Sequence, residues 1–358
     1  MNLDAVATSG SPVTHLLEFE KPIAKMEHEI RRLEADQNGS GRDYSEILSR
    51  IREQLRQAIE KAYGNLTPWE NVQVARHPQR PQLRDYIRLL CKDFCELHGD
   101  KLFSDDPAIV CGFARLADQR VMLIGHQKGR DTRERIKTNF GCAHPDGYRK
   151  ALQKMRLAAK FHVPVVCLID TPGAYPGVEA EERGIARAIA VNLMEMSRLP
   201  TPIVACVIGE GGSGGALGLA VADHVAVMQY AYYSVISPEG CAGILWRSHE
   251  EKARAAHALR LVPTELLRLN LIDSIVQEPL GGAHRDLPAA ARSLEAWVSK
   301  TLREKCRLKI ETLLKRRYDR FRSIGSFYAV TGDAPRAPET APVRSKRRRT
   351  PEVVASRG

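Results

Sequence analysis

The sequence predicts an α/β fold, and three observations carry that prediction. From about residue 85, short runs of apolar and β-branched residues alternate with helix-like stretches, as in folds that layer helices on a sheet. Two of these runs, VPVVCLID (163–170) and TPIVACVIG (201–209), are apolar on both faces, which is typical of strands buried between helix layers. Hydrophobic residues make up 43% of the 358 residues, which is enough for a sizeable core.

The first 65 residues predict a helical hairpin. Two series of apolar residues recur at three- and four-residue steps, so each series lies on one face of a helix. The glycine-containing sequence NGSG (38–41) separates the two helices. Residues 66–84 are basic and interrupted by prolines, and we expect them to form a connector. The two apolar series are Phe19, Ile23, Met26, Ile30 and Leu33, followed by Ile47, Ile51, Leu55 and Ile59.

The elements of the α/β part follow in order, and the chain then ends in a tail. We expect strands at 108–116, 121–126, 163–169, 203–208, 225–229 and 233–236. We expect helices at 148–161 and 182–198, a short one at 215–222, and further helices from residue 238 to about 325. The predicted divisions are a helical hairpin at 1–65, an α/β domain with C-terminal helices at 66–328, and a disordered, proline-containing basic tail at 329–358.

Composition argues against several classes of protein. No run of about 18 apolar residues could span a membrane, and the N-terminal sequence MNLDAVATSGSP lacks the features of a signal peptide. The eight cysteines are scattered without the paired spacing of a zinc site, so we expect no metal and a cytoplasmic location. The net charge is +11, and Lys346–Arg349 forms a basic run in the tail. No aromatic residue lies between these charges to stack on bases, so nucleic-acid binding is not expected.

A glycine-rich stretch, IGEGGSGGALGLA (208–220), follows one of the apolar strands. Gly209, Gly211 and Gly214 formally match the dinucleotide fingerprint, but the following helix is short and no carboxylate lies about 20 residues later. The lysine of a phosphate-binding P-loop is also missing. A glycine turn that leads into a helix presents free N–H groups, which can stabilise negative charge on an oxygen atom. Tight packing without a ligand is the alternative.

Two catalytic alternatives remain open at this point. Gly211–Gly215 fits the GxSxG pattern of a serine hydrolase, with Ser213 as nucleophile, although no later histidine lies in an informative motif. A hydratase would need two glutamates near the glycine turn, and spacing alone does not exclude it. The candidate glutamates are Glu179, Glu181, Glu182 and Glu239.

Two further loops follow predicted strands. Because loops at the carboxyl ends of strands form the site in α/β folds, we expect them to line one crevice with the glycine turn. The sequence HQKGR (126–130) adds fixed positive charge through Lys128 and Arg130, unless both are solvated. The second loop contains two prolines and mostly small side chains, so we expect it to be stiff. It consists of Asp170, Thr171, Pro172, Gly173, Ala174, Tyr175, Pro176 and Gly177.

Seven longer segments are distinctive when taken together: NLTPWENVQVARHPQRP, GHQKGRDTRERIKTNFG, IDTPGAYPGVEAEERG, VIGEGGSGGALGLA, YSVISPEGCAGILW, LIDSIVQEPLGGAHR and RRYDRFRSIGSF. In this order, and over roughly residues 15–328, the chain resembles the α subunits of the multi-subunit acetyl-CoA carboxylase carboxyltransferases of bacteria and plastids. The resemblance implies a crotonase-like (ClpP/crotonase) fold of repeated ββα units. It also implies transfer of a carboxyl group from carboxybiotin to acetyl-CoA, which forms malonyl-CoA for fatty acid biosynthesis.

The resemblance also implies partners and residue roles. The partners are a zinc-bearing β subunit in an α2β2 heterotetramer, the biotin carboxyl carrier protein that holds the carboxybiotin, and biotin carboxylase. By position in the motif, the amides of Gly215 and Ala216 would face the biotin oxygen, shaped by Gly211, Gly212 and Gly214. The loop from Thr171 to Gly177 would complete the biotin pocket, with Lys128 and Arg130 nearby.

Two other functions are compatible with parts of the sequence. A CoA hydratase or isomerase of the same fold would work without a β subunit. A scaffold or nucleic-acid binder would depend on the basic tail. A carboxyltransferase that acts on an acyl-CoA other than acetyl-CoA is also compatible with the sequence.

Overall fold

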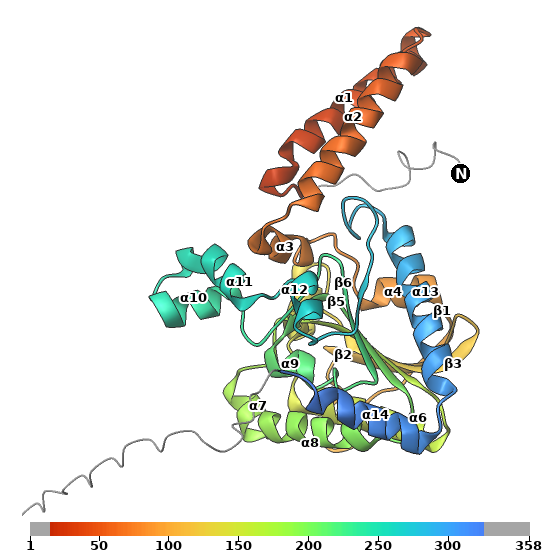
Figure 1. The fold of residues 1–358 in the computed structure, drawn as a ribbon, viewed down its shortest axis with the longest axis vertical. Coiled ribbons are helices and arrows are strands. Elements are labelled where there is room, and N and C mark those ends of the chain that lie inside the picture. The colour runs from red at the N-terminus through yellow and green to blue at the C-terminus, as the bar shows by residue number, and fades with distance from the viewer. Residues whose placement is uncertain (1–14, 326–358) are drawn as a thin grey trace, which may run out of the picture. The chain divides into compact units, whose positions relative to one another are not determined.

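A mixed β-sheet forms the centre of the computed structural model, which describes residues 15–325 (Figure 1). In this part of the chain, eight strands pair in the order β1-β2-β3-β4-β5-β6-β8, and β7 pairs with the end of β5. The first two pairings are antiparallel and all later ones are parallel. The strands are β1 (Cys91–Glu96), β2 (Ile109–Leu116), β3 (Gln119–His126), β4 (Val165–Thr171), β5 (Ile203–Gly212), β6 (His224–Met228), β7 (Tyr232–Ser234) and β8 (Ser274–Val276).

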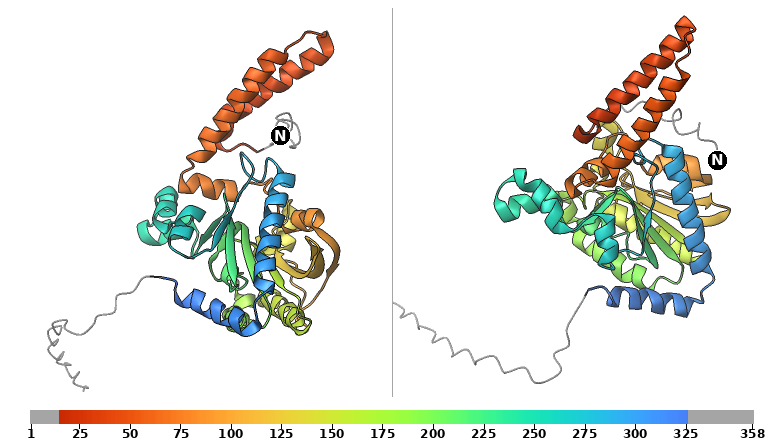
Figure 2. Two further views of the ribbon diagram at one scale, coloured as in Figure 1. Left: turned by 45° about the vertical axis from the view of Figure 1, so that its right-hand side comes forward. Right: turned by 45° about the horizontal axis from the view of Figure 1, so that its top comes forward.

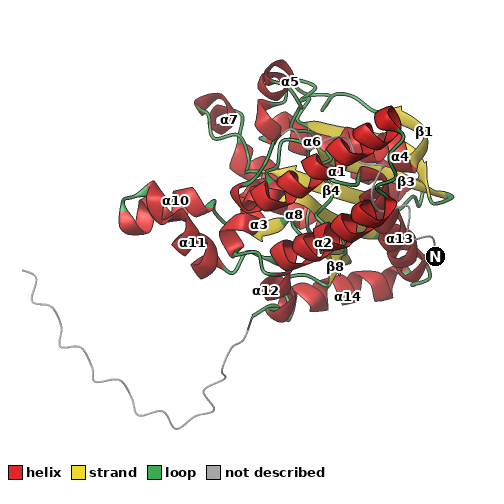
Figure 3. Cartoon of the chain, turned by 90° about the horizontal axis from the view of Figure 1, so that it is seen from above, coloured by secondary structure: helices red, strands yellow, loops and turns green. Residues whose placement is uncertain are grey.

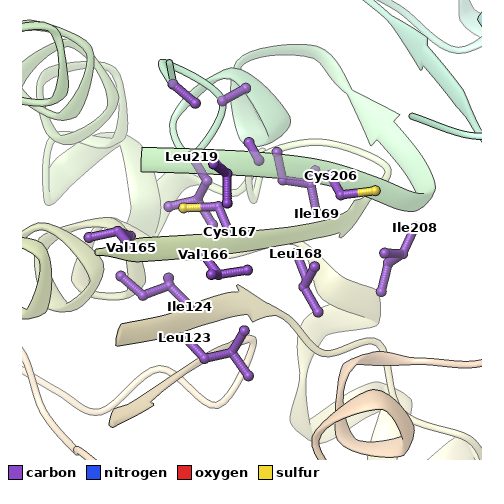
Figure 4. Packing of buried hydrophobic residues seen from close by; sticks show 14 of the residues in the cluster. Leu123, Ile124, Val165, Val166, Cys167, Leu168, Ile169, Cys206, Ile208 and Leu219 are labelled. Carbon is purple, nitrogen blue, oxygen red and sulfur yellow. The ribbon is translucent and has the colours of Figure 1, made fainter. Parts of the chain in front are cut away.

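The central strands β4 and β5 are buried along their whole length, as their apolar sequences predict. Their side chains interlock with those of β3 and with Leu219 to form the main core (Figure 4). A strand that is apolar on both faces needs a helix layer on each side. The predicted α/β fold is confirmed: β2, β3 and α6 form one ββα unit, and later parallel strands alternate with helices.

Helices cover the sheet in two layers (Figure 2). Helices α6 (Pro145–Lys160) and α8 (Ile185–Arg198) are the crossovers between parallel strands and pack against each other. Helices α4 (Leu83–Leu90) and α13 (Leu287–Cys306) pack on the sheet through Leu123 and Leu168. The remaining helices are α3 (Pro68–Ala75), α5 (Thr132–Lys137), α7 (Val178–Glu182), α9 (Ser213–Leu217), α10 (Pro238–Trp246), α11 (Lys252–Leu259), α12 (Pro263–Arg268) and α14 (Ile310–Arg322), with single 3₁₀ turns at Glu18–Glu20, Asn139–Gly141 and His249–Glu251.

The N-terminal helices α1 (Lys21–Ser40) and α2 (Ser45–Gly64) run side by side (Figure 3). A buried polar cluster ties them to the loop before α13. Tyr63 donates a hydrogen bond of 2.6 Å to Glu20, and Arg285 forms an ion pair of 2.9 Å with the same carboxylate. Residues 1–324 belong to one unit and 325–358 to another. The divisions predicted at residues 65/66 and 328/329 stay predictions, and the tail lies outside the described residues.

Several element boundaries differ from the sequence-based expectation, for local reasons. The predicted connector contains α3, because Thr67 caps the helix in a capping box with Glu70 and proline occupies the first helical position. The predicted helix 182–198 is interrupted at Gly184, whose φ of 76° lies in the left-handed region. Strand β5 continues through the glycines to Gly212, because β7 pairs with its end. Strands β1 and β8 were not predicted from the sequence.

Candidate functional site

The glycine turn forms where β5 passes directly into α9 (Figure 1). The helix begins at Ser213, two residues earlier than predicted, and ends at Leu217. Ser213 has a φ of 51°, a left-handed conformation that is unfavourable for a residue other than glycine. Strained backbone of this kind, in a sharp turn from a strand to a helix, often marks a functional site.

The Asp170–Gly177 loop packs directly against this turn, as the sequence predicts for loops at the ends of neighbouring strands. A Cβ atom on Gly212 would overlap the carbonyl oxygen of Pro172, and one on Gly215 would lie 2.5 Å from the nitrogen of Ala174. Both positions therefore require glycine, because backbone meets backbone there. The tight-packing role of these two glycines is now explained by the structure.

The outer side of the same junction is open. A Cβ atom on Gly173 would meet nothing within 4 Å, and one on Gly214 would meet only the end of Ile189 at 3.6 Å. Gly214 is half-buried and Ser213 is exposed. The structure thus leaves space above bare backbone at this edge, where a ligand atom can approach the amides closely.

The amides at the start of α9 differ in their availability. In an α-helix each N–H donates to the carbonyl four residues earlier, so the N–H of Ala216 is directed at Gly212. The amides of Ser213, Gly214 and Gly215 have no acceptor within the helix. Of the two amides predicted as oxyanion donors, only the Gly215 N–H has no hydrogen-bond acceptor within the helix.

The Asp170–Gly177 loop is held in shape by short-range contacts. The hydroxyl of Thr171 donates to the carbonyl of Gly173 at 2.7 Å and accepts from its N–H at 3.1 Å. The Tyr175 ring stacks on His144, with ring centres 4.1 Å apart, and its N–H donates to Ala143 at 3.0 Å. These contacts give a rigid wall beside the glycine turn, as predicted for a stiff loop; Pro176 and Gly177 complete it.

Lys128 lies beneath the glycine turn and joins the ends of β4 and β5. Its Nζ atom is 2.7 Å from Asp170 and 2.6 Å from Glu210. Glu210 also accepts hydrogen bonds from Arg76 at 2.7 Å and from the hydroxyl of Tyr232 at 2.5 Å. Two carboxylates and two cations are therefore paired at the carboxyl ends of two central strands. All four side chains line a pocket of about 230 Å³.

Electrostatics keeps this network ionised. Burial favours the protonated form of Glu210, but the charges of Lys128 and Arg76 outweigh it and lower the pKa of Glu210 to about 2. Burial opposes the charge on Lys128 as well, yet Asp170 and Glu210 raise its pKa above the ordinary value. Nearby His126 is fully buried with both ring nitrogens unpaired in the described structure, and burial lowers its pKa to about 3. These shifts favour the charged forms of Glu210 and Lys128 and the neutral form of His126.

Arg130 lies apart from this network, although it is only two residues from Lys128. Its guanidinium is about half-exposed and pairs with Asp85 of α4. The structure therefore separates the two predicted cations: Lys128 supports the turn, and Arg130 belongs to the surface.

Asp170 was expected only as part of the second loop, without a role of its own, and Glu210, Arg76 and Tyr232 were not predicted as members of the site. Asp170 and Glu210 carried a usable signal, because each is a carboxylate at the end of an apolar strand and beside a glycine-rich loop. Arg76 carried none, because it follows the end of α3 and lies 134 positions before Glu210 in the sequence.

The serine hydrolase alternative finds no support in the geometry. The side chain of Ser213 is exposed, and within residues 15–325 it forms no hydrogen bond to a histidine. A nucleophilic serine needs such a base within reach. Among the glutamates considered for a hydratase, Glu239 is already paired with Arg76 at 2.6 Å.

One cluster in the described structure has residue types that can bind a metal: Glu20, His77 and His284. Both nitrogens of His77 are engaged, one with the carbonyl of His15 and the other with the N–H of Gln79. Glu20 is neutralised by Arg285. Because these atoms already have partners, we interpret the cluster as an anchor for the N-terminal helices and not as a cation site.

The fold and the candidate site together define an α/β protein in which a glycine turn and a second loop meet at the carboxyl ends of two central parallel strands. The chain belongs to the acetyl-coenzyme A carboxylase carboxyltransferase-like family, whose model matches residues 16–325. This confirms the family resemblance seen in the sequence, and it makes the chain a component of a carboxyltransferase enzyme.

Curated relatives match over nearly their full length. The carboxyl transferase subunit alpha of acetyl-coenzyme A carboxylase from Rhodopirellula baltica is 53% identical over 315 residues, which is 87% of this chain and 97% of that protein. The subunit of the same name from Methylococcus capsulatus is 52% identical over 311 residues, with the same shares covered. The β subunit of geranyl-CoA carboxylase from P. aeruginosa superposes with a TM-score of 0.49 at 16% identity, over 74% of this chain and 48% of that one. Within residues 15–325, no helix has the length and apolar character needed to cross a membrane.

Proposed function

We propose that this chain is the α subunit of an acetyl-CoA carboxylase carboxyltransferase, which transfers a carboxyl group to acetyl-CoA and forms malonyl-CoA. The observation that carries the proposal is the match at 53% identity to an α subunit of that name over 97% of its length. The junction of the glycine turn and the Asp170–Gly177 loop supports it, because bare backbone there leaves room for a ligand.

The proposed site uses backbone amides. Carboxybiotin on the carrier protein would supply the carboxyl group. The amide of Gly215 and that of Gly214 next to it would donate to the biotin oxygen that gains negative charge, which lowers the energy of the transition state. We propose the Gly214 amide instead of the Ala216 amide as the second donor, because the Ala216 N–H already donates to a carbonyl within α9. Gly211 and Gly212 shape the turn, and Thr171–Gly177 would form the pocket wall.

The proposed partners are a zinc-bearing β subunit in an α2β2 heterotetramer, the biotin carboxyl carrier protein and biotin carboxylase, all in the cytoplasm. An exposed apolar surface gives the β subunit a place to bind beside the site. We call Val235, Ile244 and Leu245 the apolar patch; these side chains are 76%, 73% and 61% exposed. Val235 lies near the glycine turn in space, because β7 pairs Ser234 with Gly212 and Val235 comes next; Ile244 and Leu245 follow in α10. Exposed apolar clusters of this kind mark protein interfaces.

The function is tested by reconstitution of the full chain with a β subunit. We expect malonyl-CoA from acetyl-CoA and carboxylated carrier protein only when both subunits are present. The lone chain is expected to leave crotonyl-CoA unchanged, because a carboxyltransferase α subunit acts only together with its β subunit, whereas a hydratase needs no such partner. Hydration of crotonyl-CoA by the lone chain, or a stable complex that forms no malonyl-CoA, would contradict the proposal.

Replacing Ile244 with aspartate is expected to weaken association with the β subunit by about tenfold or more, because a charge placed in an apolar interface cannot be solvated. The dissociation constant of the complex measures this. Phe161→Asp is the matched control: Phe161 is also exposed, but it follows α6 at the opposite, amino-terminal ends of the parallel strands. An equal effect of both variants would show that the apolar patch does not bind the β subunit.

A further inference from the structure

The pocket of about 230 Å³ beside Lys128 has a second wall, which the proposed site does not use. This wall comes from α5 and from the turn that follows it, and it contributes Arg135 and Phe140 to the pocket. Pro172 also lines the pocket, and its carbonyl is the group that leaves no room for a Cβ atom on Gly212. The pocket therefore adjoins the glycine turn, and its volume suits a single small ring system better than a drug-sized ligand.

The turn Asn139–Gly141 in this wall has a strained backbone. Its three residues have φ angles of 50°, 57° and 83°, in the left-handed region, which is unfavourable for a bulky residue such as Phe140. Contacts with the neighbouring loop impose this conformation. The hydroxyl of Thr138 donates to the carbonyl of Lys128 at 2.6 Å, and a Cβ atom on Gly141 would lie 2.8 Å from the Lys128 side chain. Strain that is held in place by its surroundings gathers at functional sites.

The side chain of Phe140 gains little from folding in return for this strain. It is 55% exposed, so burial of its apolar surface is incomplete. An exposed aromatic ring at the edge of a pocket offers a flat apolar face on which another ring can pack. A ligand in the pocket therefore explains both the position of the ring and the conformation of its backbone.

Most of the positive charge in this pocket is already paired with carboxylates. The lysine and two of the three arginines that line it form ion pairs of 2.6 to 2.7 Å, which leave no free cation for a ligand. The pairs are Arg76 with Glu210 and Glu239, Arg80 with Glu278, and Lys128 with Asp170 and Glu210.

Arg135 differs from these cations. Within residues 15–325 it forms no ion pair, and its Nε atom donates one long hydrogen bond of 3.4 Å to the carbonyl of Gly129. Its backbone position is fixed, because a Cβ atom on Gly129 would lie 2.5 Å from the Arg135 nitrogen, so α5 packs directly on this loop. The guanidinium is therefore positioned at the pocket and is available to an anionic group that enters it.

We propose that Phe140 and Arg135 bind carboxybiotin during the carboxyl transfer; the inference rests on the proposed function of the chain. The ring of Phe140 packs against the biotin ring system, and the guanidinium of Arg135 pairs with the carboxylate that is to be transferred. The pairing with Arg135 ends when the carboxyl group moves to acetyl-CoA. Arg135 therefore favours carboxylated biotin over free biotin, whereas Phe140 binds both forms.

Steady-state kinetics of the complex with the β subunit separates the two roles. In the reverse direction, malonyl-CoA gives its carboxyl group to the ureido nitrogen of free biotin, and the proton of that nitrogen goes to the carbon that becomes the methyl group of acetyl-CoA. We expect Phe140→Ala to raise the KM for free biotin in this reaction by about fivefold or more, because the packing of the two rings is lost.

In the forward direction, Arg135→Ala is expected to raise the KM for the carboxylated carrier protein by about tenfold, because a charge-assisted contact is lost. The inhibition constant of the uncarboxylated carrier is expected to stay within about twofold, because free biotin has no carboxylate for Arg135. Arg135→Lys is expected to have an intermediate KM, because lysine keeps the charge but not the planar fork of donors.

Phe140→Gly distinguishes binding from a structural role. Glycine adopts a φ of 57° without strain, so this variant is expected to keep or raise the melting temperature of the complex while the KM for biotin still rises. The matched controls are Arg133→Ala and Ile136→Ala, because both residues are exposed on α5 and neither lines the pocket. Their effects on either KM are expected to stay within about twofold.

The outcomes separate this inference from the proposed function. A wild-type complex that forms no malonyl-CoA contradicts the proposed function, and this inference with it. If the wild-type complex is active, the inference alone is overturned by unchanged KM values in Phe140→Ala and Arg135→Ala, or by equal effects in the controls. It is also overturned if Arg135→Ala weakens the uncarboxylated carrier as much as the carboxylated one, or if Phe140→Gly lowers the melting temperature.

Discussion

Gly215→Pro is expected to lower the rate of carboxyl transfer by about 100-fold or more, because it removes a backbone N–H that we propose as an oxyanion donor. Loss of one such donor costs roughly 2.7–4 kcal/mol of transition-state stabilisation in enzymes where it has been measured. The measurement is malonyl-CoA formation by the complex with the β subunit. Its melting temperature and subunit composition show whether the complex is intact.

Two other variants separate the amide from the packing. Gly215→Ala keeps the N–H, but its Cβ still lies 2.5 Å from the nitrogen of Ala174, so this variant measures the packing cost alone. Gly214→Ala places its Cβ in ordinary contact with Ile189 and in the space proposed for the ligand, so it is expected to lower carboxyl transfer without lowering the melting temperature. If Gly215→Pro and Gly215→Ala lose the same activity, the Gly215 amide is not a donor.

Lys128→Met is expected to lower the free energy of unfolding by about 3–5 kcal/mol, the usual cost of leaving a buried charge without its partner. Asp170 and Glu210 are both buried, and each lies within 2.7 Å of the lysine Nζ atom. Without that charge, the two carboxylates repel each other at the ends of β4 and β5. The glycine turn is attached to the same ends, so carboxyl transfer is expected to fall as well. Denaturation by urea measures the change in stability.

Arg130→Met is the matched control, and it is expected to cost only about 0.2–1 kcal/mol, as for an ion pair near the surface. Equal losses for the two variants would show that the Lys128 network does not stabilise the turn.

The network also predicts that the stability of the protein depends on pH. The pKa of Glu210 falls from 4.5 to about 2 on folding, so its contribution to stability is present above pH 4.5 and is lost as the pH falls toward 2.

Much of the fold was predictable because its signals are local. The apolar runs at 163–169 and 203–208 form β4 and β5, and the helices predicted at 148–161 and 182–198 correspond to α6 and to α7 with α8. The errors occur where tertiary pairing overrides local preference. The glycines of 209–212 look like a loop, but β7 extends the strand through them by parallel pairing at Glu210–Gly212. The short β8 has too few residues for a periodic pattern.

By itself, the sequence determined the α/β class, the family, and the two glycine-containing loops that line the candidate site. These features are visible in the sequence because they depend on the periodicity of apolar residues and on the spacing of motifs, and both are set by residue order. Only the tertiary structure decided which atoms meet. It showed that Gly212 and Gly215 are required by backbone contact, that the partly buried Lys128 lies between two carboxylates, and that Arg130 is on the surface. A contact between distant parts of the chain, such as Arg76 with Glu210, leaves no periodic trace in the sequence, because it depends on how the helices and strands pack.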